Sequence, residues 1–391
     1  MNSSLKTNQF AIRSFLNQEF CQSLKKDWET IPFPTEKEES FRKFPISSIQ
    51  WEELGFDPRE TQIGIELQNQ DSANLHVEPL LSETKQKEIL DTIKQYLPKE
   101  YFVYLSILKA SEISVFLCDG NFHLATESMF GDEPKFLFRI FYVPKGSSTQ
   151  IQLKTETRHT TENLHLLTVF DVLIAESDSV VEILDEENFD EDLIQFRSIL
   201  VLAKENASLR FHHFPFGGFR SKWFLLSHLL GKGGEVTVDG VSAIGRRNLK
   251  DMDMEMYHHA DHTTSKISYK AIVTDKSHHV FTGNLIIPPN LKKVVAHQES
   301  FNLSLNKKAR AEANPKLEVL AEDVSCTHGA TVGDIDEEQY FYLLSRGLSP
   351  EESKSLLVTA FYGETIQSIG FDEETKQNLE SSIHTILVGG K

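Results

Sequence analysis

Cysteine and histidine, two residue types that bind soft and borderline metals, stand two positions apart at Cys326 and His328. They follow an alternating apolar run over residues 317–322 that is typical of a β-strand. If the alternation continues past Asp323, both side chains lie on one face, close enough to serve one site. A thiolate and an imidazole favour iron, zinc or copper over magnesium or calcium. Two ligands make half a site, so a metal bound here needs further ligands from elsewhere.

The other cysteines cannot complete that site in an obvious way. Cys21 and Cys118 lie far away in the sequence, and no Cys-x-x-Cys motif exists. A self-contained iron–sulfur cluster is normally held by four thiolates, which three dispersed cysteines cannot supply. Any cluster must therefore be shared between chains. Three cysteines in 391 residues also argue against a disulfide framework.

Histidines are numerous but mostly unsuited to shared metal binding. Three adjacent pairs occur, at His212-His213, His258-His259 and His278-His279. Neighbouring residues of a strand point to opposite faces, so we expect the members of each pair to diverge. His258 and His262 are four apart, but the glutamate of a metalloprotease helix is missing between them. A polar ladder or a subunit contact is the favoured interpretation of these two.

Catalytic signatures are absent from the sequence. Residues 230–234 are rich in glycine, but they lack the spacing and the hydroxyl of a phosphate-binding loop. We predict a turn there. No Gly-x-Ser-x-Gly motif is present either, so nothing points to an enzyme.

The composition limits the classes of partner and the cellular compartment that we expect for this chain. The net charge of −18 disfavours nucleic acid, which needs a concentrated basic surface. No run approaches the ~20 apolar residues of a membrane span, and the polar start is unlike a signal peptide. We therefore expect a cytoplasmic protein with no membrane and no nucleic-acid partner.

The elements that must position Cys326 and His328 change type along the chain. Near-helical spacing of Phe10, Phe15, Leu16 and Phe20 predicts a first helix. Ser82 begins a second and Pro98 stops it, with an irregular connection over about 29–60.

From about residue 112 to 333, short apolar alternations recur between polar turns. They begin at Val181, Leu209, Val236 and Ile267, which are 28, 27 and 31 residues apart. This spacing indicates stacked repeats. From these residues alone, a β-sandwich and a β-solenoid fit equally well.

The end of the chain is predicted to be helical again. One helix covers 336–346, with Gly347 in a left-handed cap. Ser349 and Glu352 match a capping box around Pro350 at the first helical position. The apolar face of this second helix is predicted at Leu356, Leu357, Ala360 and Phe361. A last helix is expected over about 373–387.

The stretch from Pro315 to Gly333 carries a longer pattern than its cysteine and histidine. It contains a proline, an apolar–Glu–apolar strand, an acidic pair, then Val-x-Cys-x-His-Gly-Ala-Thr-Val-Gly. This pattern resembles the SufD branch of the SufB/SufD family, the scaffold proteins of SUF iron–sulfur cluster assembly. The resemblance continues over residues 336–347. Ala309 stands where the SufB branch has an essential cysteine, which favours SufD.

Further resemblance extends over about residues 150–370. It includes spaced histidines, a Thr-Ser and a Tyr-Lys, at His258, His262, Thr264-Ser265 and Tyr269-Lys270. A weaker match over residues 31–44 has Phe41 where the family usually has tryptophan.

The resemblance implies a mainly β fold, a right-handed parallel β-helix between two helical domains. The domains are then 1–110, mainly helical, 111–333, the β-helix core, and 334–391, C-terminal helical. The implied function is a non-catalytic scaffold subunit that pairs with SufB through the strand edges of the β-helix. A homodimer is also allowed when the chain is alone.

The resemblance also implies where iron and the ATPase bind. His328, with Cys326, would help to receive iron or to hold a nascent cluster shared with SufB. No cofactor would be stably bound to the chain alone. The SufC ATPase would dock on the C-terminal helices, for which the expected contact residues are Tyr340, Phe341, Arg346, Leu357 and Phe361.

The alternative from a different class is a β-solenoid carbohydrate-active enzyme. Such an enzyme needs two carboxylates across a sugar-binding groove. No paired-carboxylate motif or aromatic groove is apparent in the sequence.

Overall fold

The structure is a computed structural model. It describes residue 16 and residues 18–54, 81–110, 112–130, 134–159 and 164–388. Phe10 and Phe15, which belong to the predicted first helix, lie outside the described residues. No helix among the described residues is long and apolar enough to cross a membrane.

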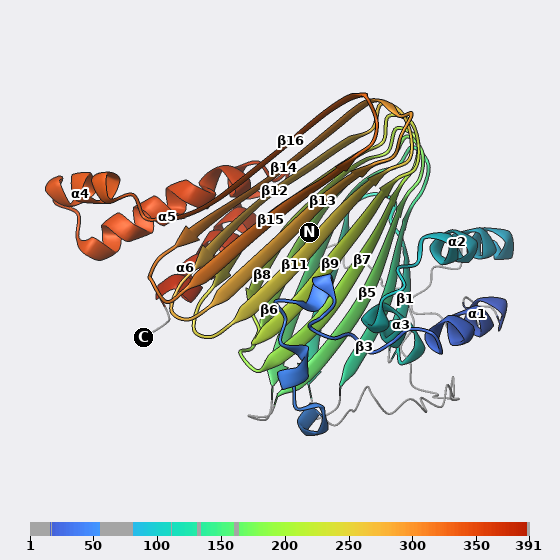
Figure 1. Cartoon of the computed structure of the whole chain (residues 1–391), viewed down its shortest axis with the longest axis horizontal. Helices are drawn as coiled ribbons and strands as arrows, with labels where there is room; N and C mark the ends of the chain where they lie inside the picture. The colour runs from blue at the N-terminus through green and yellow to red at the C-terminus, as the bar shows by residue number, and fades with distance from the viewer. Residues whose placement is uncertain are drawn as a thin grey trace, which may run out of the picture.

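Two eight-stranded parallel sheets form the centre of the molecule, and successive strands alternate between them (Figure 1). The odd-strand sheet consists of β1 (Glu112–Leu117), β3 (Lys135–Val143), β5 (His165–Ala175), β7 (Leu193–Ala203), β9 (Arg220–Leu229), β11 (Leu249–His258), β13 (His278–Ile287) and β15 (Arg310–Val319). The even-strand sheet consists of β2 (Phe122–Phe130), β4 (Ser148–His159), β6 (Val180–Phe189), β8 (Ser208–Gly217), β10 (Glu235–Ile244), β12 (Thr264–Val273), β14 (Lys292–Ser304) and β16 (Asp323–Asp334).

This alternation confirms the parallel β-helix and excludes the β-sandwich. Each coil contributes one strand to each sheet, and its inward side chains pack against the coils before and after it. The right-handed sense of the coil stays a prediction.

The predicted repeats are stacked in register. Val181 pairs with Leu209, and Leu209 pairs with Val236. Ile267 pairs with Val238 instead, two residues further along, because Ser265 is the partner of Val236. An even offset keeps the side chains on the same face, so the predicted inward residues stay inward. Residues 230–234 connect β9 to β10, as predicted.

The apolar core has three large clusters and a smaller fourth one around Leu167 and Leu193. One cluster fills the space between the two sheets and includes Phe211, Trp223 and Tyr269. A second joins the outer face of the odd-strand sheet to the N-terminal segments, and a third lies between the even-strand sheet and the C-terminal helices. Both sheets are therefore covered on the outside over part of their length.

The N-terminal cover consists of α1 (Gln18–Trp28), α2 (Glu83–Tyr96), α3 (Tyr101–Leu108) and three 3₁₀ helices, η2 (Glu39–Phe41), η3 (Ile46–Ser48) and η4 (Trp51–Leu54). Ser82 caps α2 by accepting a hydrogen bond from the Lys85 N–H at 3.3 Å, as predicted. Phe102 of α3 stacks on Phe196 of β7, with ring centroids 3.6 Å apart. The predicted irregular connection contains the three short 3₁₀ helices.

The C-terminal helices match their predicted positions. They are α4 (Glu337–Ser345), α5 (Pro350–Gln367) and α6 (Glu373–Val388). The capping box between Ser349 and Glu352 is formed in both directions, and Gly347 has a φ of 92°. In Figure 1, α4 lies away from the sheets, while α6 lies close to them.

The predicted apolar face of α5 is correct only in part, because Phe361 packs against the apolar cluster on the even-strand sheet but other residues of that face do not. Leu356 and Ala360 are exposed, whereas Val358, Tyr362 and Ile366 pack on the even-strand sheet. Apolar residues occur on more than one side of this helix, so spacing alone did not identify the side that meets the sheet. The misassigned side includes an exposed apolar residue, Leu356.

Candidate functional site

Cys326 and His328 lie on β16, the last strand of the even-strand sheet. β16 pairs with β14 on one side, and Cys326 is in register with Ala296 and His328 with Gln298. No described strand pairs with its other side. The predicted strand is therefore confirmed, and strand alternation places both residues on one face.

The Cys326 side chain is half-buried and packs against the apolar cluster between the sheets. Burial raises the pKa of its thiol, so the thiolate is scarcer at neutral pH than for an exposed cysteine. A metal binds the thiolate and releases the proton. Cys326 can therefore act as a ligand, but only when a metal or a nearby cation favours the deprotonated form.

His328 is exposed, and its neighbour in register is a buried amide. The Gln298 Nε2 donates to the Lys316 carbonyl at 2.8 Å, which ties β14 to β15 across the interior. The Gln298 Oε1 is buried without a hydrogen-bond partner among the described residues. Gly283 leaves room for this amide, because a Cβ there would lie 2.1 Å from Oε1. The Gln298 side chain thus fills the space between the two sheets next to the last coil.

The last coil is open at its outer edge. None of the residues of β15 and β16 is buried. Leu320 is 71% exposed and Val332 54% exposed, although both are large and apolar. Pro315 lies in β15, and proline is confined to edge strands because it cannot donate to a ladder. Within the described part of the chain, the coil that carries Cys326 and His328 therefore presents unpaired backbone and apolar side chains.

A second histidine lies beside the site on the opposite face of the same sheet. His297 of β14 contacts the Thr327 hydroxyl through Nδ1, and its Nε2 lies 2.9 Å from Glu299. Thr327 stands between Cys326 and His328, so it points away from them. His297 is thus a neighbour of the site without sharing its face.

The paired histidines diverge, as predicted. His213 points between the sheets and stacks on Trp223, with centroids 4.5 Å apart, while His212 contacts Asp239 on the outer face at 2.7 Å. His279 likewise stacks on Tyr269 inside, and His278 contacts Glu312 outside.

His258 is a structural residue. Its ring nitrogens contact the hydroxyls of Thr263 at 2.7 Å and Ser265 at 2.9 Å. Burial lowers its pKa to about 4, so it is neutral. His262 lies in a turn with a φ of 59°, so the two histidines share neither a strand nor a helix.

A buried ionic cluster between the sheets was not predicted. The Arg197 guanidinium donates to Asp185 at 2.7 Å and Glu187 at 2.6 Å, and its Nε donates to Asp171 at 3.0 Å. Arg139 also binds Asp171. Burial would raise the pKa of Asp171, but the two arginines outweigh it and lower that pKa. A lone arginine within the apolar run of β7 was the sequence signal for this cluster.

Asp185, Glu187 and His213 are close enough for a metal, since their ligand atoms lie within 4.8 Å of one another. The Arg197 guanidinium already donates hydrogen bonds to both carboxylates and occupies the space between them, so the donor set does not fit a metal centre. Both carboxylates are also buried. They cannot reach a polysaccharide, so they give no support to the carbohydrate-enzyme alternative.

A second set of charges anchors the C-terminal helices. His212 contacts both Asp239 and Glu182. Glu182 in turn accepts the Gly370 N–H at 2.7 Å, in the connection between α5 and α6. Burial lowers the pKa of His212, but the hydrogen bonds to the two carboxylates outweigh it and raise the pKa to about 9. His212 is therefore charged at neutral pH.

The predicted partner residues have different environments. Phe341 is 71% exposed on α4, and Arg346 is exposed at its end. Tyr340 is half-buried. Leu357 and Phe361 of α5 are also half-buried, and Lys270 donates to the Phe361 carbonyl at 2.8 Å. Within the C-terminal helices, the large exposed apolar residues are therefore Phe341 and Tyr342 of α4 and Leu356 of α5.

Comparison with known proteins covers the β-helix in particular. The family model "SUF system FeS cluster assembly, SufBD core domain" matches residues 136–361, more than half of the chain. The iron–sulfur cluster assembly protein SufD of Escherichia coli K12 is 31% identical over 190 residues, which is 49% of this chain and 45% of that protein.

Two further relatives are named as SufBD family proteins of iron–sulfur cluster assembly. One, from Synechocystis, is 32% identical over 129 residues, 33% of this chain and 28% of that protein. The other, from Staphylococcus saprophyticus, is 26% identical over 203 residues, 52% of this chain and 43% of that protein. The matches span less than half the length of each of these relatives. With the parallel β-helix and its flanking helices, they show that the chain belongs to the SufBD family of the SUF system and is similar to SufD within it.

Proposed function

We propose that this chain is a non-catalytic scaffold subunit of a cytoplasmic SUF complex. It would support iron acquisition and the assembly of a nascent iron–sulfur cluster at an interface with SufB. His328 and Cys326 would supply ligands from this side, and SufB would supply the others. Iron and the cluster are cargo here, held transiently and passed on.

The observation that carries the proposal is the position of both residues on the open last coil. Among the described residues β16 pairs with β14 alone, and Cys326 and His328 share a face on it. A cluster needs about four ligands, and two of them at a free edge leave the remaining positions to a partner. A site buried within the chain would exclude such sharing.

SufB would pair with the edges of β15 and β16. Main-chain hydrogen bonds along a free edge give affinity, and exposed apolar side chains such as Leu320 and Val332 add buried area. In the absence of SufB, the same edge could pair with a second copy of the chain. This accounts for the homodimer that the family resemblance allows.

SufC would dock on α4 and the outer side of α5. α4 has no buried residue, and Phe341 and Leu356 are large exposed apolar side chains near one another in sequence. Apolar residues rimmed by charge mark a protein interaction surface. Because α5 and α6 cover the even-strand sheet, substitutions such as Phe341→Ala test docking better than a truncation that would uncover this sheet.

The test is His328→Ala in a chain that is co-expressed with SufB and SufC. The side chain is exposed, so we expect a change in unfolding free energy of about 0.5 kcal/mol or less and a normal yield of complex. Imidazole binds iron and carries protons near neutral pH, and alanine does neither, so iron–sulfur content should fall. Complex yield by size-exclusion chromatography is compared with iron and sulfide content.

His297→Ala is the matched control, because His297 lies on the neighbouring strand but on the opposite face. It should leave the iron–sulfur content near that of the wild type. Full cluster assembly with His328→Ala would remove the residue from the proposed function. Loss of the complex itself would show that His328 is structural instead.

A further inference from the structure

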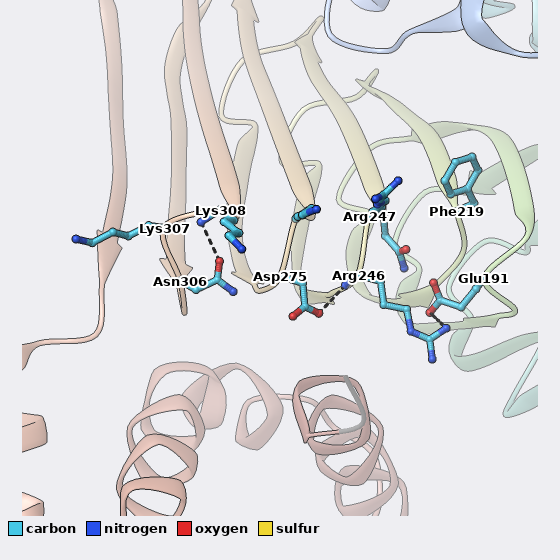
Figure 2. A pocket seen from close by; sticks show the side chains of 10 residues that line it. Glu191, Phe219, Arg246, Arg247, Asp275, Asn306, Lys307 and Lys308 are labelled. Atoms are coloured by element: carbon cyan, nitrogen blue, oxygen red, sulfur yellow. Dashed lines mark hydrogen bonds and ion pairs between the residues drawn. The ribbon is translucent and has the colours of Figure 1, made fainter. Parts of the chain in front are cut away.

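A cavity of about 780 Å³ lies on the edge of the β-helix where even strands turn into odd strands. Its wall is built by five successive turns, and the first of them, between β6 and β7, contributes Glu191. Phe219 lies in the turn between β8 and β9, Arg246 and Arg247 between β10 and β11, Lys276 between β12 and β13, and Lys307 and Lys308 between β14 and β15. Figure 2 shows Arg246, Arg247 and Lys308 in a row between Phe219 at one end and Lys307 at the other.

The cavity is basic although the chain carries a net charge of −18. Five cationic side chains line it against two carboxylates, Glu191 and Asp275. Both carboxylates contact Arg246, because Glu191 lies 3.6 Å from its Nη1 and Asp275 accepts its backbone N–H at 2.7 Å. Within the described part of the chain, the other four cations have no ion-pair partner.

The stacking of the coils sets the spacing of these cations. Neighbouring strands of a sheet lie about 4.8 Å apart, so the three cationic turns form a ladder roughly 10 Å long. A diphosphate or triphosphate group has several negative charges over a comparable length. Exposed cations on successive rungs can each bind one phosphate.

The two ends of the ladder differ, and the difference points to the rest of the ligand. Phe219 and Glu191 lie at one end, away from Lys307 and Lys308 (Figure 2). A carboxylate repels phosphate but can accept a hydrogen bond from the amino group of a base. An aromatic ring can stack on a base. The volume of the cavity is also within the range of about 300–1,000 Å³ that is typical of small-molecule sites.

We propose that this cavity binds a nucleoside di- or triphosphate, with the base near Phe219 and the phosphates along the cationic turns. The site is separate from Cys326 and His328, so it does not depend on the function proposed for them. An acidic peptide is a different class of ligand. It would use the cations but would gain nothing from an aromatic ring at one end only.

The experiment measures binding to the isolated full-length chain by calorimetry at low salt, without SufC. The ligands are ATP, inorganic tripolyphosphate and a hexaglutamate peptide. We expect ATP to bind several-fold more tightly than tripolyphosphate, and both affinities to fall as salt rises from 50 to 300 mM. The double variant Lys276→Ala/Lys308→Ala should weaken the binding of ATP and of tripolyphosphate by about tenfold or more.

Two variants separate the parts of the site. Phe219→Leu keeps an apolar side chain but removes the aromatic ring, so it should weaken ATP binding and leave tripolyphosphate binding unchanged. Lys232→Ala removes an exposed turn lysine outside the cavity, between β9 and β10, and should change neither affinity. Absence of ATP binding, equal affinities for ATP and tripolyphosphate, or tighter binding of hexaglutamate would each overturn the proposal.

Discussion

The central coils and the last coil use the same parallel pairing but bury their side chains very differently. Every residue of β5 and β7 is buried, whereas no residue of β15 or β16 is. β5 and β7 have paired strands on both sides and the N-terminal segments above them. Among the described residues, β15 and β16 have a paired strand on one side only, and the N-terminal segment reaches β15 through the ion pairs Lys43–Glu312 and Glu39–Lys316. Burial in this β-helix is thus set by the number of neighbours, and the strand pattern alone does not reveal it.

The same difference separates the two sets of polar residues. In the central coils, Arg197 and its carboxylates satisfy one another inside the protein. On the last coil, His328 is exposed and Cys326 is half-buried at a free edge. Polar groups of the first kind stabilise the fold, and those of the second kind are available to a partner. The following predictions test that division.

The largest effect is expected for Arg197→Leu. The substitution leaves Asp185 and Glu187 buried without their cation, and breaking a buried pair from one side costs about 3–5 kcal/mol. The free energy of unfolding, measured with urea, should fall by that amount. Arg210→Ala is the control, because Arg210 is exposed on β8, and it should cost about 0.5 kcal/mol or less. Equal costs for the two variants would contradict the role assigned to the cluster.

An intermediate effect is expected for His212→Gln, which weakens the anchor of the C-terminal helices. The folded pKa of about 9 lies above the ordinary 6.5. The charged form of His212 is therefore favoured by folding, and its contribution is complete below pH 6.5 and is lost as pH rises through 9. From the size of this pKa shift, we expect His212 to contribute about 3 kcal/mol at most to the free energy of unfolding at neutral pH.

The measurement is the difference in unfolding free energy between wild type and His212→Gln at pH 6.5 and pH 9.5. All other groups are common to both proteins, so the difference isolates His212 and its two carboxylates. It should shrink at the higher pH, and hydrogen exchange in α5 and α6 should be faster in the variant at pH 6.5. A difference that grows with pH would show that His212 is neutral in the folded protein.

For Val332→Lys we expect a small effect on the stability of the chain and a large effect on its assembly with SufB. Val332 is 54% exposed on β16, so the free energy of unfolding should change by about 0.5 kcal/mol or less. A lysine on a free edge opposes strand pairing, so co-purification with SufB should be lost. Val180→Lys is the matched control, with 52% exposure on β6 away from the edge. Equal loss of SufB with both variants would count against pairing through the last coil.

The smallest effect concerns the Cys326 thiol in the isolated chain. Because burial raises its pKa, alkylation by iodoacetamide at pH 7 should be slower than for a small free thiol and should speed up above pH 9. Mass spectrometry of the modified peptide measures the rate. Addition of ferrous iron in the absence of oxygen should slow the reaction further if the thiolate is a ligand. A rate that does not depend on pH would contradict the raised pKa.

The sequence predicted the features that depend on short-range chemistry. The capping box at Ser349, the end of α2 before Pro98 and the opposite directions of His212 and His213 each follow from a few neighbouring residues. The stacked repeats were also predictable, because Val181, Leu209 and Val236 stand one coil apart. The strand that carries Cys326 and His328 was predicted for the same reason.

Features that depend on distant parts of the chain were not predicted. The inward side of α5 is set by Phe214, Val241 and other residues of the even-strand sheet, more than 100 positions earlier. The partners of Arg197 come from β5 and β6, and a lone arginine in a strand does not reveal them. The basic cavity likewise exists only because the coils place separate turns side by side.

The buried ionic cluster has a consequence for how the chain avoids stacking its coils in the wrong order. Successive coils are similar in length and rich in the same aliphatic residues, so a slip by one whole coil would still bury apolar surface. Such a slip would move Arg197 away from Asp185 and Glu187 and leave three charges in an apolar interior. Only one order of coils places them together. We therefore expect the cluster to specify the correct order of the coils. Misaligned folding intermediates would bury unpaired charges and be destabilised, although their hydrophobic packing alone would be acceptable.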